Sequence, residues 1–258
     1  MKFEIVTLFP EYFELSLRQS LLGRAWDKKL FDIEIINLRD FATDRHRTVD
    51  DAPFGGGGGM VLKLEPLDRC LGALGCPRAG EADPERHQTV LTSAAGRLFD
   101  QKTAIRYSLG DRVTVICGHY LGVDERLMDM YEIDEVSVGD YILTGGEPAA
   151  AVIVDAVARL IPGVIGNFES ALRDSHMDGT LGAPVYTRPA EYDKRRVPEA
   201  LLSGDPKKVE AWERIEALHK CARNRPDLLK RMDLTDQERQ ALRGPAEEEL
   251  EDIERNER

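Results

Sequence analysis

The first 160 residues alternate between two hydrophobic periodicities. Continuous runs of β-branched and aromatic residues predict buried strands, and segments with apolar residues every three or four positions predict helices between them. The predicted strands are 3–9, 31–37, 89–92, 113–117 and 134–138, and the predicted helices are 11–28, 64–74, 101–108, 125–130 and 148–160. This alternation is typical of an α/β layer built on a mostly parallel sheet.

The pattern changes after Pro162. Residues 163–187 are rich in Gly, Ser and Asp and show little periodicity, which predicts a linker or a substrate loop. Helical spacing returns over 188–244, and the Glu-rich residues 245–258 are expected to be a frayed acidic tail. Within the helical part we expect helices at 198–202 and 207–221, a further turn at Pro226, and a helix from Gln237 capped by Thr235.

Length and composition narrow the class of protein. The 258 residues suffice for one large domain or two small ones, and 42% hydrophobic residues exclude wholesale disorder. No uncharged apolar run approaches the ~20 residues of a spanning helix, and Glu4 and Glu11 interrupt any export signal. The four cysteines follow no CxxC pattern. We therefore expect a reduced, cytoplasmic protein without a disulfide framework or zinc site.

The net charge of −12 argues against a nucleic-acid partner, but the charge is unevenly distributed. Residues 188–231 hold 12 Lys and Arg against 8 Asp and Glu, so a basic stretch lies within an acidic protein. Such a stretch is either a solvated helix face or an electrostatic binding surface.

Several common site patterns are absent from the sequence. It has no GxGxxG, no GxSxG and no HExxH, and no Lys-Ser or Lys-Thr follows the glycines at 55–59. Each isolated histidine is therefore more simply interpreted as a surface residue, or as a residue whose hydrogen bonds are already made, than as a metal ligand. We identify no metal site from the sequence.

Three glycine-rich loops each follow a predicted strand, at 93–96, 118–122 and 139–146. Open α/β sheets bind ligands at the carboxyl ends of their strands, and small residues there let the backbone reach a ligand. The three loops could form one pocket for a flat, polar molecule such as a nucleoside. Alternatively, the glycines only turn the chain.

These loops lie within a series of motifs that resembles a known family. The motifs are Leu8-Phe9-Pro10, DDAPFGGGGGMV at 50–61, GHYLGVDER at 118–126, SVGDYILTGGE at 137–147, DAVARLIPG at 155–163, Asp174-Ser175, YTRP at 186–189, VPEALLSG at 197–204 and RPDL at 225–228. Each motif alone is weak, whereas their order and spacing together are specific. The chain resembles the bacterial tRNA (guanine-N1)-methyltransferases of the knotted, SPOUT-type superfamily, which methylate the guanosine 3′ of the anticodon.

The resemblance implies a fold and a cofactor. It implies that 1–162 is an α/β domain ending in a deep trefoil knot, a rare topology, and that this domain binds the methyl donor S-adenosylmethionine. It further implies a homodimer whose active sites are shared between chains. Mg²⁺ is expected from the family, although no ligand cluster for it is evident. The implied donor contacts are Ser93, Gly118, Tyr120, Gly122, Val138, Gly139, Asp140, Tyr141, Ile142, Leu143, Gly145 and Gly146.

Methyl transfer to guanine N1 needs a base, because N1 carries a proton at neutral pH. It also needs a cation or a hydrogen-bond donor for the negative charge that develops on O6. Asp174 matches the family's general base and Arg159 its O6-stabilising residue. From the residues alone, a loop-capping Asp and a surface Arg are the simpler interpretations. The helical domain at 188–244 would bind tRNA phosphates, and the target base must leave its stack. The implied RNA contacts are Lys194, Arg195, Arg196, Lys207, Lys208, Arg223 and Arg225.

The chain also departs from the family. Leu121 stands where the family has a Glu that could face the donor's amino group, and His119 replaces an Arg. Gly182 and Val185 replace an Asp and a His beside the substrate, and Ala94-Ala95 replaces Pro-Gln.

Two other functions stay open at this point. One is a related knotted methyltransferase of ribosomal RNA, against which the YTRP-to-RPDL segment argues. The other is a non-catalytic RNA-binding protein, against which the presence of Asp174 and Arg159 argues.

Overall fold

The computed structural model describes residues 1–81, 83, 86–166 and 174–243. The chain divides into two compact units, Met1–Phe168 and Glu169–Arg258, which are described separately. The division falls within the stretch 163–187, for which a linker or substrate loop is predicted. The predicted tail at 245–258 lies outside the described residues.

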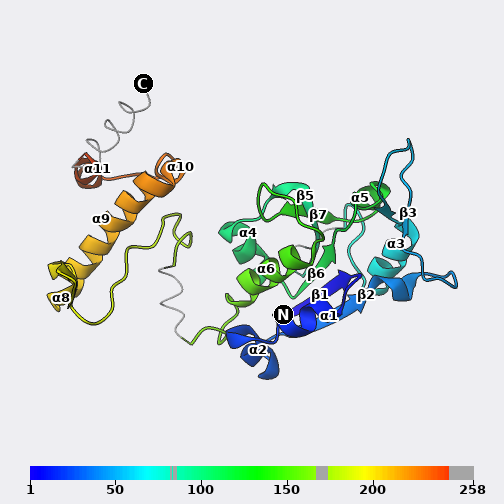
Figure 1. Cartoon of the computed structure of the whole chain (residues 1–258), viewed down its shortest axis with the longest axis horizontal. Coiled ribbons are helices and arrows are strands. Elements are labelled where there is room, and N and C mark those ends of the chain that lie inside the picture. Colours follow the sequence, from blue (N-terminus) through cyan, green and yellow to red (C-terminus); the bar gives the residue numbers. More distant parts are fainter. Residues whose placement is uncertain (82, 84–85, 167–173, 244–258) are drawn as a thin grey trace. The chain divides into compact units, whose positions relative to one another are not determined.

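The first unit is built on five parallel strands (Figure 1). They are β1 (Lys2–Thr7), β2 (Asp32–Asn37), β5 (His87–Leu98), β6 (Arg112–Cys117) and β7 (Ile133–Ser137). Their order across the sheet is β2-β1-β6-β5-β7. The prediction of an α/β fold with a mostly parallel sheet is therefore confirmed.

Helices cover both faces of this sheet. The remaining elements of the unit are α1 (Glu11–Ser16), α2 (Ser20–Asp27), η1 (Leu38–Phe41), β3 (Asp50–Asp51), β4 (Val61–Leu62), α3 (Leu64–Ala73), α4 (Gln101–Ser108), α5 (Arg126–Met130) and α6 (Glu147–Ala158). Buried residues of α1, α2, α4 and α6 form one apolar cluster with the strands. Those of η1, α3 and α5 form a second cluster with alternate strand residues. Each face thus has its own core, as the two-residue period of a strand requires.

Two local predictions are wrong. The single helix predicted at 11–28 is broken, because Ser20 takes a left-handed φ of 56°. The carbonyl of Arg18 lies so close to Gly23 that no side chain fits there. The chain therefore passes close to the first turn of α2 before the helix begins.

The second error concerns residues 93–96, predicted as a loop after a short strand. The structure instead continues β5 to Leu98, with a register shift against β7 between Thr92 and Arg97. A Cβ on Gly96 would lie 2.5 Å from the backbone nitrogen of Val136. The missing side chain therefore lets the bulged strand cross close to its neighbour.

The second unit surrounds one long helix. Its elements are β8 (Glu191–Tyr192), β9 (Arg195–Arg196), α8 (Glu199–Leu202), α9 (Pro206–Asn224), α10 (Pro226–Leu229) and α11 (Asp236–Leu242). Helices α8, α10 and α11 pack on α9, and Leu181, Cys221 and Leu228 form a small core. Thr235 caps α11 in a reciprocal capping box with Glu238, as predicted for that residue. Among the described helices, none is both long and apolar enough to cross a bilayer.

Candidate active site

One cavity of about 480 Å³ lies where β6 and β7 end and beside the bulged part of β5, and residues of all three glycine-rich segments line it. The structure thus brings together segments that are distant in sequence, as the position of parallel strand ends predicts. Eleven of the twelve expected donor contacts line this cavity, and Asp140 does not.

Close contacts between glycines join two of these loops. The Gly146 amide donates to the Gly118 carbonyl at 2.7 Å, and His119 pairs with Gly145 in an antiparallel bridge. A Cβ on Gly146 would lie 2.6 Å from the Gly118 nitrogen and would also clash with the Thr92 hydroxyl. These glycines therefore let two loops meet, so the alternative that they only turn the chain does not account for them.

Polar groups surround Gly145 inside this junction. A Cβ there would lie 2.6 Å from His119 Nδ1 and 2.5 Å from Glu147 Oε2. The His119 ring packs against Phe9 and Tyr120, and its buried Nδ1 has no hydrogen-bond partner among the described residues. The buried Glu147 accepts a hydrogen bond of 2.8 Å from the Thr7 hydroxyl. Gly145 thus occupies a space that no other residue fits without displacement.

The segment 50–61 contacts the loop 118–122, which lines the cavity. The Leu121 amide donates to the Met60 carbonyl and the Leu62 amide to the Gly122 carbonyl, both at 3.0 Å. A Cβ on Gly59 would lie 3.0 Å from the Leu121 side chain. The sequence analysis used this segment only for the resemblance and assigned it no contact with the pocket loops.

The charges of the cavity restrict its ligand. Among the described residues that line it, the only charged side chains are Glu125 and Glu135, and neither Lys nor Arg is present. A phosphate-rich cofactor would lack a cationic partner here, whereas a cationic nucleoside would meet carboxylates. Exposed Tyr141, Ile142 and Leu143 add flat apolar surface. The cavity therefore fits S-adenosylmethionine, whose adenosine is flat and whose sulfonium and ammonium groups are positive.

The two predicted catalytic residues do not line this cavity. Arg159 is half-buried and follows the last residue of α6, whose first turn borders the cavity at Gly146 and Ala149. The ten steps from Ala149 to Arg159 span about 15 Å at 1.5 Å per residue. Asp174 is exposed in the second unit, where it lines a cavity of about 870 Å³ beside α9.

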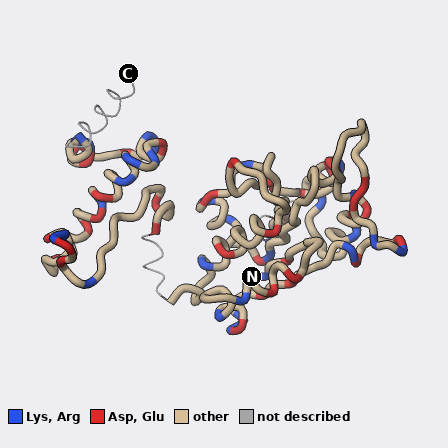
Figure 2. The backbone as a smooth tube through the Cα atoms, in the orientation of Figure 1, with Lys and Arg blue, Asp and Glu red and all other residues tan. Residues whose placement is uncertain are grey.

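The predicted RNA contacts divide into two groups along α9. Lys207 and Lys208 lie in its first turn, and Arg223 and Arg225 at its other end, about 24 Å from Lys207 by helical rise. Arg225 is ion-paired with Asp227 at 2.8 Å. Figure 2 shows acidic residues interleaved with the basic ones in this unit.

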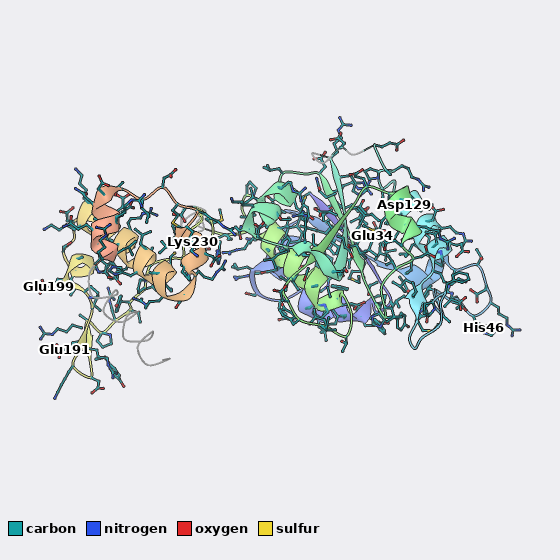
Figure 3. All side chains as sticks on the ribbon, turned by 90° about the horizontal axis from the view of Figure 1, so that it is seen from above. Glu34, His46, Asp129, Glu191, Glu199 and Lys230 are labelled. Atoms are coloured by element: carbon teal, nitrogen blue, oxygen red, sulfur yellow. The ribbon has the colours of Figure 1, made fainter. Side chains whose placement is uncertain are left out.

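The other three predicted contacts lie on the β8–β9 hairpin. Lys194 is at its turn, Arg195 pairs with Asp193 at 3.6 Å, and Arg196 pairs with Glu191 at 2.7 Å. Figure 3 labels Glu191 at this hairpin and Glu199 on α8, and also His46, which is exposed on the long loop of the first unit.

Metal ligands do not gather in the described part of the chain, where no group of three or more His, Cys, Asp or Glu side chains is placed to hold an ion. The Mg²⁺ that the family resemblance implies stays a prediction.

Comparison with known proteins adds to this geometry. Residues 1–231 match the family model described as tRNA (Guanine-1)-methyltransferase TrmD. A tRNA (guanine-N(1)-)-methyltransferase of Geobacter metallireducens is 48% identical over 242 residues, covering 94% of this chain and 96% of that protein. The enzyme of the same name from Bacteroides fragilis is 47% identical and covers 89% and 99% of the two chains. That from Brevibacillus brevis is 46% identical and covers 94% and 97%.

Proposed function

The chain belongs to the tRNA (guanine-1)-methyltransferase family, and we propose that its glycine-loop cavity holds the methyl donor for this reaction. The protein is an enzyme that methylates N1 of guanosine in tRNA. S-adenosylmethionine supplies the methyl group when bound. The guanosine 3′ of the anticodon is the target position that we propose.

The observation that carries the donor site is the convergence of three loops on one cavity without cationic side chains. Backbone groups of 138–146 would bind the adenine edge, and Gly145 and Gly146 let this segment lie directly against the loop 118–122. The apolar Val138 and Leu143, which line the cavity, would cover the adenine faces.

Asp174 and Arg159 are proposed as the catalytic pair. Asp174 would accept the N1 proton as the methyl group transfers, and Arg159 would donate to O6 as negative charge develops there. Both side chains suit these roles: a carboxylate is a base, and a guanidinium stays protonated and presents several N–H donors.

The position of Arg159 supports an active site shared between two chains. About 15 Å of helical rise separates it from Ala149 at the cavity of its own subunit, which is more than an arginine side chain spans. In a two-fold homodimer, Arg159 and Asp174 of one chain would serve the donor cavity of the partner.

Exposed apolar residues near this helix support the homodimer. Helix α1 packs on α6, and Tyr12, Leu15 and Val152 are each at least 42% exposed. Phe9, 45% exposed, stacks on His119 at the cavity. A second copy would cover such a surface.

Three further proposals follow from family membership. The strands and loops of 1–162 would form the trefoil knot that closes the donor site. The basic residues of 188–244 would hold tRNA through its phosphates, with 163–187 acting as linker and substrate loop. The enzyme would act in the cytoplasm, where its tRNA substrate is made.

Mass spectrometry of nucleosides tests the function. Unmodified tRNA incubated with the protein and S-adenosylmethionine should yield 1-methylguanosine next to the anticodon. The Asp174→Asn variant should lose about 10²- to 10⁴-fold in kcat while it still binds the donor. Methylation of a ribosomal RNA in place of tRNA would favour the related rRNA enzyme, and donor binding without any methylation would favour a non-catalytic protein.

A further inference from the structure

The segment that carries Asp174 lies against α9 within the second unit. Residues between 174 and 185, together with side chains of α9, line the cavity of about 870 Å³. Leu181, which is 9% exposed, packs with Cys221 of α9 and Leu228 of α10 in the small core of this unit. An apolar contact therefore anchors this part of the predicted linker to the helices.

Residues 174–182, the Asp174 loop, are closed by their own hydrogen bonds. The Gly182 amide donates to the Ser175 hydroxyl at 2.8 Å. The Thr180 amide and hydroxyl both donate to the Asp178 carboxylate, at 2.9 and 2.6 Å. Local hydrogen bonds of this kind fold a short polar segment into a defined turn.

Two cationic side chains of α9 contact this loop. The Lys220 ammonium group donates to the Gly182 carbonyl at 3.3 Å. The Arg214 guanidinium lies 4.0 Å from the Asp178 carboxylate and donates to Glu238 of α11 at 2.7 Å. Lys220 thus holds the backbone at one end of the loop, and Arg214 joins the loop to α11.

The cations of α9 are of two kinds. Lys207 and Lys208 in its first turn are exposed, and among the described residues their side chains make no hydrogen bond or ion pair. Lys220 and Arg214 are half-buried and already bound to protein groups. Exposed lysines suit contacts with phosphate, whereas half-buried cations with protein partners hold structure. Lys220 and Arg214 therefore act on the loop.

We propose that Lys220 and Arg214 fix the Asp174 loop on α9, so that the unit proposed to bind tRNA also places the carboxylate that accepts the N1 proton. Both are positioning residues, because they affect the reaction only through Asp174. The proposal rests on the role of Asp174 proposed above. A displacement of about 1 Å at a reacting group costs up to about 10²-fold in rate, so a loosened loop should slow methyl transfer.

The rate of methyl transfer in a single turnover, with enzyme and S-adenosylmethionine in excess over tRNA, tests this proposal. Lys220→Met removes the ammonium donor and keeps the apolar stem, and it should lower this rate about tenfold. Its donor affinity should stay within about twofold of wild type, because residues of the first unit line the donor cavity. Lys220→Arg keeps a cationic donor and should retain most of the rate.

A second background separates positioning from a general effect on the fold. The carboxylate is already absent in Asp174→Asn, so adding Lys220→Met should change the remaining rate by less than about twofold. Arg214→Gln should show the same dependence on Asp174. Amide hydrogen exchange gives a measure that does not depend on activity: the Gly182 amide should exchange faster in Lys220→Met, while the amides of α9 keep their protection.

The matched control is Glu210→Gln. Glu210 is an exposed residue of α9 that lines the same cavity, and its side chain contacts no described residue through a hydrogen bond or ion pair. This variant should leave both the single-turnover rate and the exchange of the Gly182 amide unchanged.

Three results would overturn the proposal. An equal loss from Lys220→Met with and without the Asp174 carboxylate would mean that Lys220 supports the fold and does not place the base. A loss confined to tRNA affinity would make Lys220 an RNA contact. Unchanged rates in both Lys220→Met and Arg214→Gln would leave the loop independent of α9. By contrast, Asp174→Asn protein that methylates tRNA at the wild-type rate would reject Asp174 as the base, whatever the effect of Lys220→Met.

Discussion

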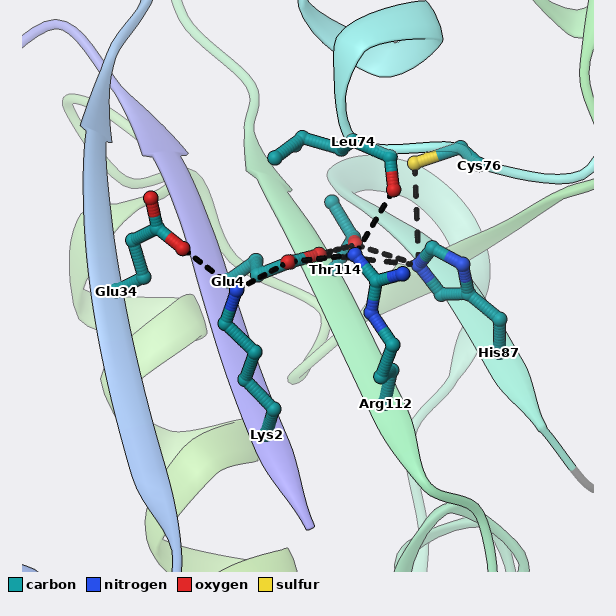
Figure 4. A network of polar contacts seen from close by, with 8 residues as sticks. All are labelled: Lys2, Glu4, Glu34, Leu74, Cys76, His87, Arg112 and Thr114. Atoms are coloured by element: carbon teal, nitrogen blue, oxygen red, sulfur yellow. Dashed lines mark hydrogen bonds and ion pairs between the residues drawn. The ribbon is translucent and has the colours of Figure 1, made fainter.

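Replacement of Glu4 by glutamine tests a buried ion network at the opposite end of the sheet from the donor cavity (Figure 4). Glu4 on β1 has no exposed surface. Its carboxylate accepts hydrogen bonds from Lys2 at 2.9 Å, Arg112 at 2.6 Å and Thr114 at 2.8 Å. His87 Nε2 lies 3.9 Å from Glu4 and 2.7 Å from the Thr114 hydroxyl. One carboxylate thus ties β1 to β6 and, through Thr114, to β5.

The loss of stability expected for Glu4→Gln depends on the interactions that Lys2 and Arg112 keep in the variant. Removing one member of a fully buried ion pair costs about 3–5 kcal/mol. Here the side chains of Lys2 and Arg112 are 39% and 34% exposed, so water compensates in part. Lys2 also keeps Glu34 at 2.6 Å, and Arg112 keeps the Leu74 carbonyl at 2.8 Å. We therefore expect Glu4→Gln to lower the free energy of unfolding by about 2 kcal/mol, or about 4–8 °C in Tm.

The pH dependence of unfolding gives a second measure. Burial alone would raise the pKa of Glu4, but hydrogen bonds from Lys2, Thr114 and Arg112 hold it below its usual value. Burial and the charge of Arg112 lower the pKa of His87. Both groups therefore bind protons more weakly in the folded protein than in the unfolded one. Their contribution to stability is lost as the pH falls. The loss begins below about pH 6.5 for His87 and below about pH 4.3 for Glu4.

Urea unfolding between about pH 3 and about pH 8 is the assay, because the loss at Glu4 begins below about pH 4.3, and Glu34→Gln is the matched control. The Glu34 side chain is 53% exposed, so its pair with Lys2 is worth at most about 1 kcal/mol. Glu4→Gln should also flatten the acidic limb of the stability curve. A Glu4→Gln protein as stable as Glu34→Gln at every pH would refute the assigned role of the network.

The remaining predictions concern the active site. Gly145→Val should weaken donor binding about ten- to hundredfold, because a side chain there meets His119 and Glu147. The control Gly58→Val, whose side chain would lie in open space, should leave donor binding unchanged. Calorimetry measures both affinities, and equal values would reject the site. Gly145→Val and Asp174→Ala chains mixed 1:1 should regain about a quarter of wild-type activity, since about half the dimers are mixed and each has one intact site. No recovery, in a mixture shown by native mass spectrometry to contain mixed dimers, would mean that each site is self-contained. Affinity for tRNA, measured by filter binding, should fall as the salt concentration rises. The double variant Lys207→Gln, Lys208→Gln should reduce the slope of log K against log salt by about 1–2. An affinity that does not change with salt would contradict an electrostatic role for these residues.

The sequence predicted where the five strands of the sheet lie, because each of them contains at least one buried β-branched residue. It failed where a glycine meets backbone outside its own helix or strand. The break before Ser20 depends on the approach of Arg18 to Gly23, and the bulge of β5 depends on Gly96 crossing Val136. Periodicity carries no information on such contacts, because a glycine in a loop and a glycine at a crossing look alike.

The cavity between the glycine-rich loops could be predicted from the sequence, but the partners of the charged residues around it could not. Loops at the ends of parallel strands must meet at one edge, so the glycine segments located the cavity. Glu135 lines the cavity, whereas the adjacent Asp134 is held by Arg97 and Arg106, which lie 37 and 28 residues away in sequence. No local pattern separates the two adjacent carboxylates.

The length of helix α6 relates the two parts of the proposed mechanism, which are the donor site and the catalytic residue Arg159. Helix α6 begins at the donor cavity and ends at Arg159, so its length sets how far the O6 donor lies from the methyl group within one chain. About 15 Å of helical rise lies between Ala149 at the cavity and Arg159, which is far for a reaction in which both groups contact one guanine. In the homodimer that we propose, a second copy would cover the exposed face of α1 and α6, and Arg159 of each chain would reach the cavity of the other. On this reasoning, variants that dissociate the dimer should lose methyl transfer while each chain still binds the donor.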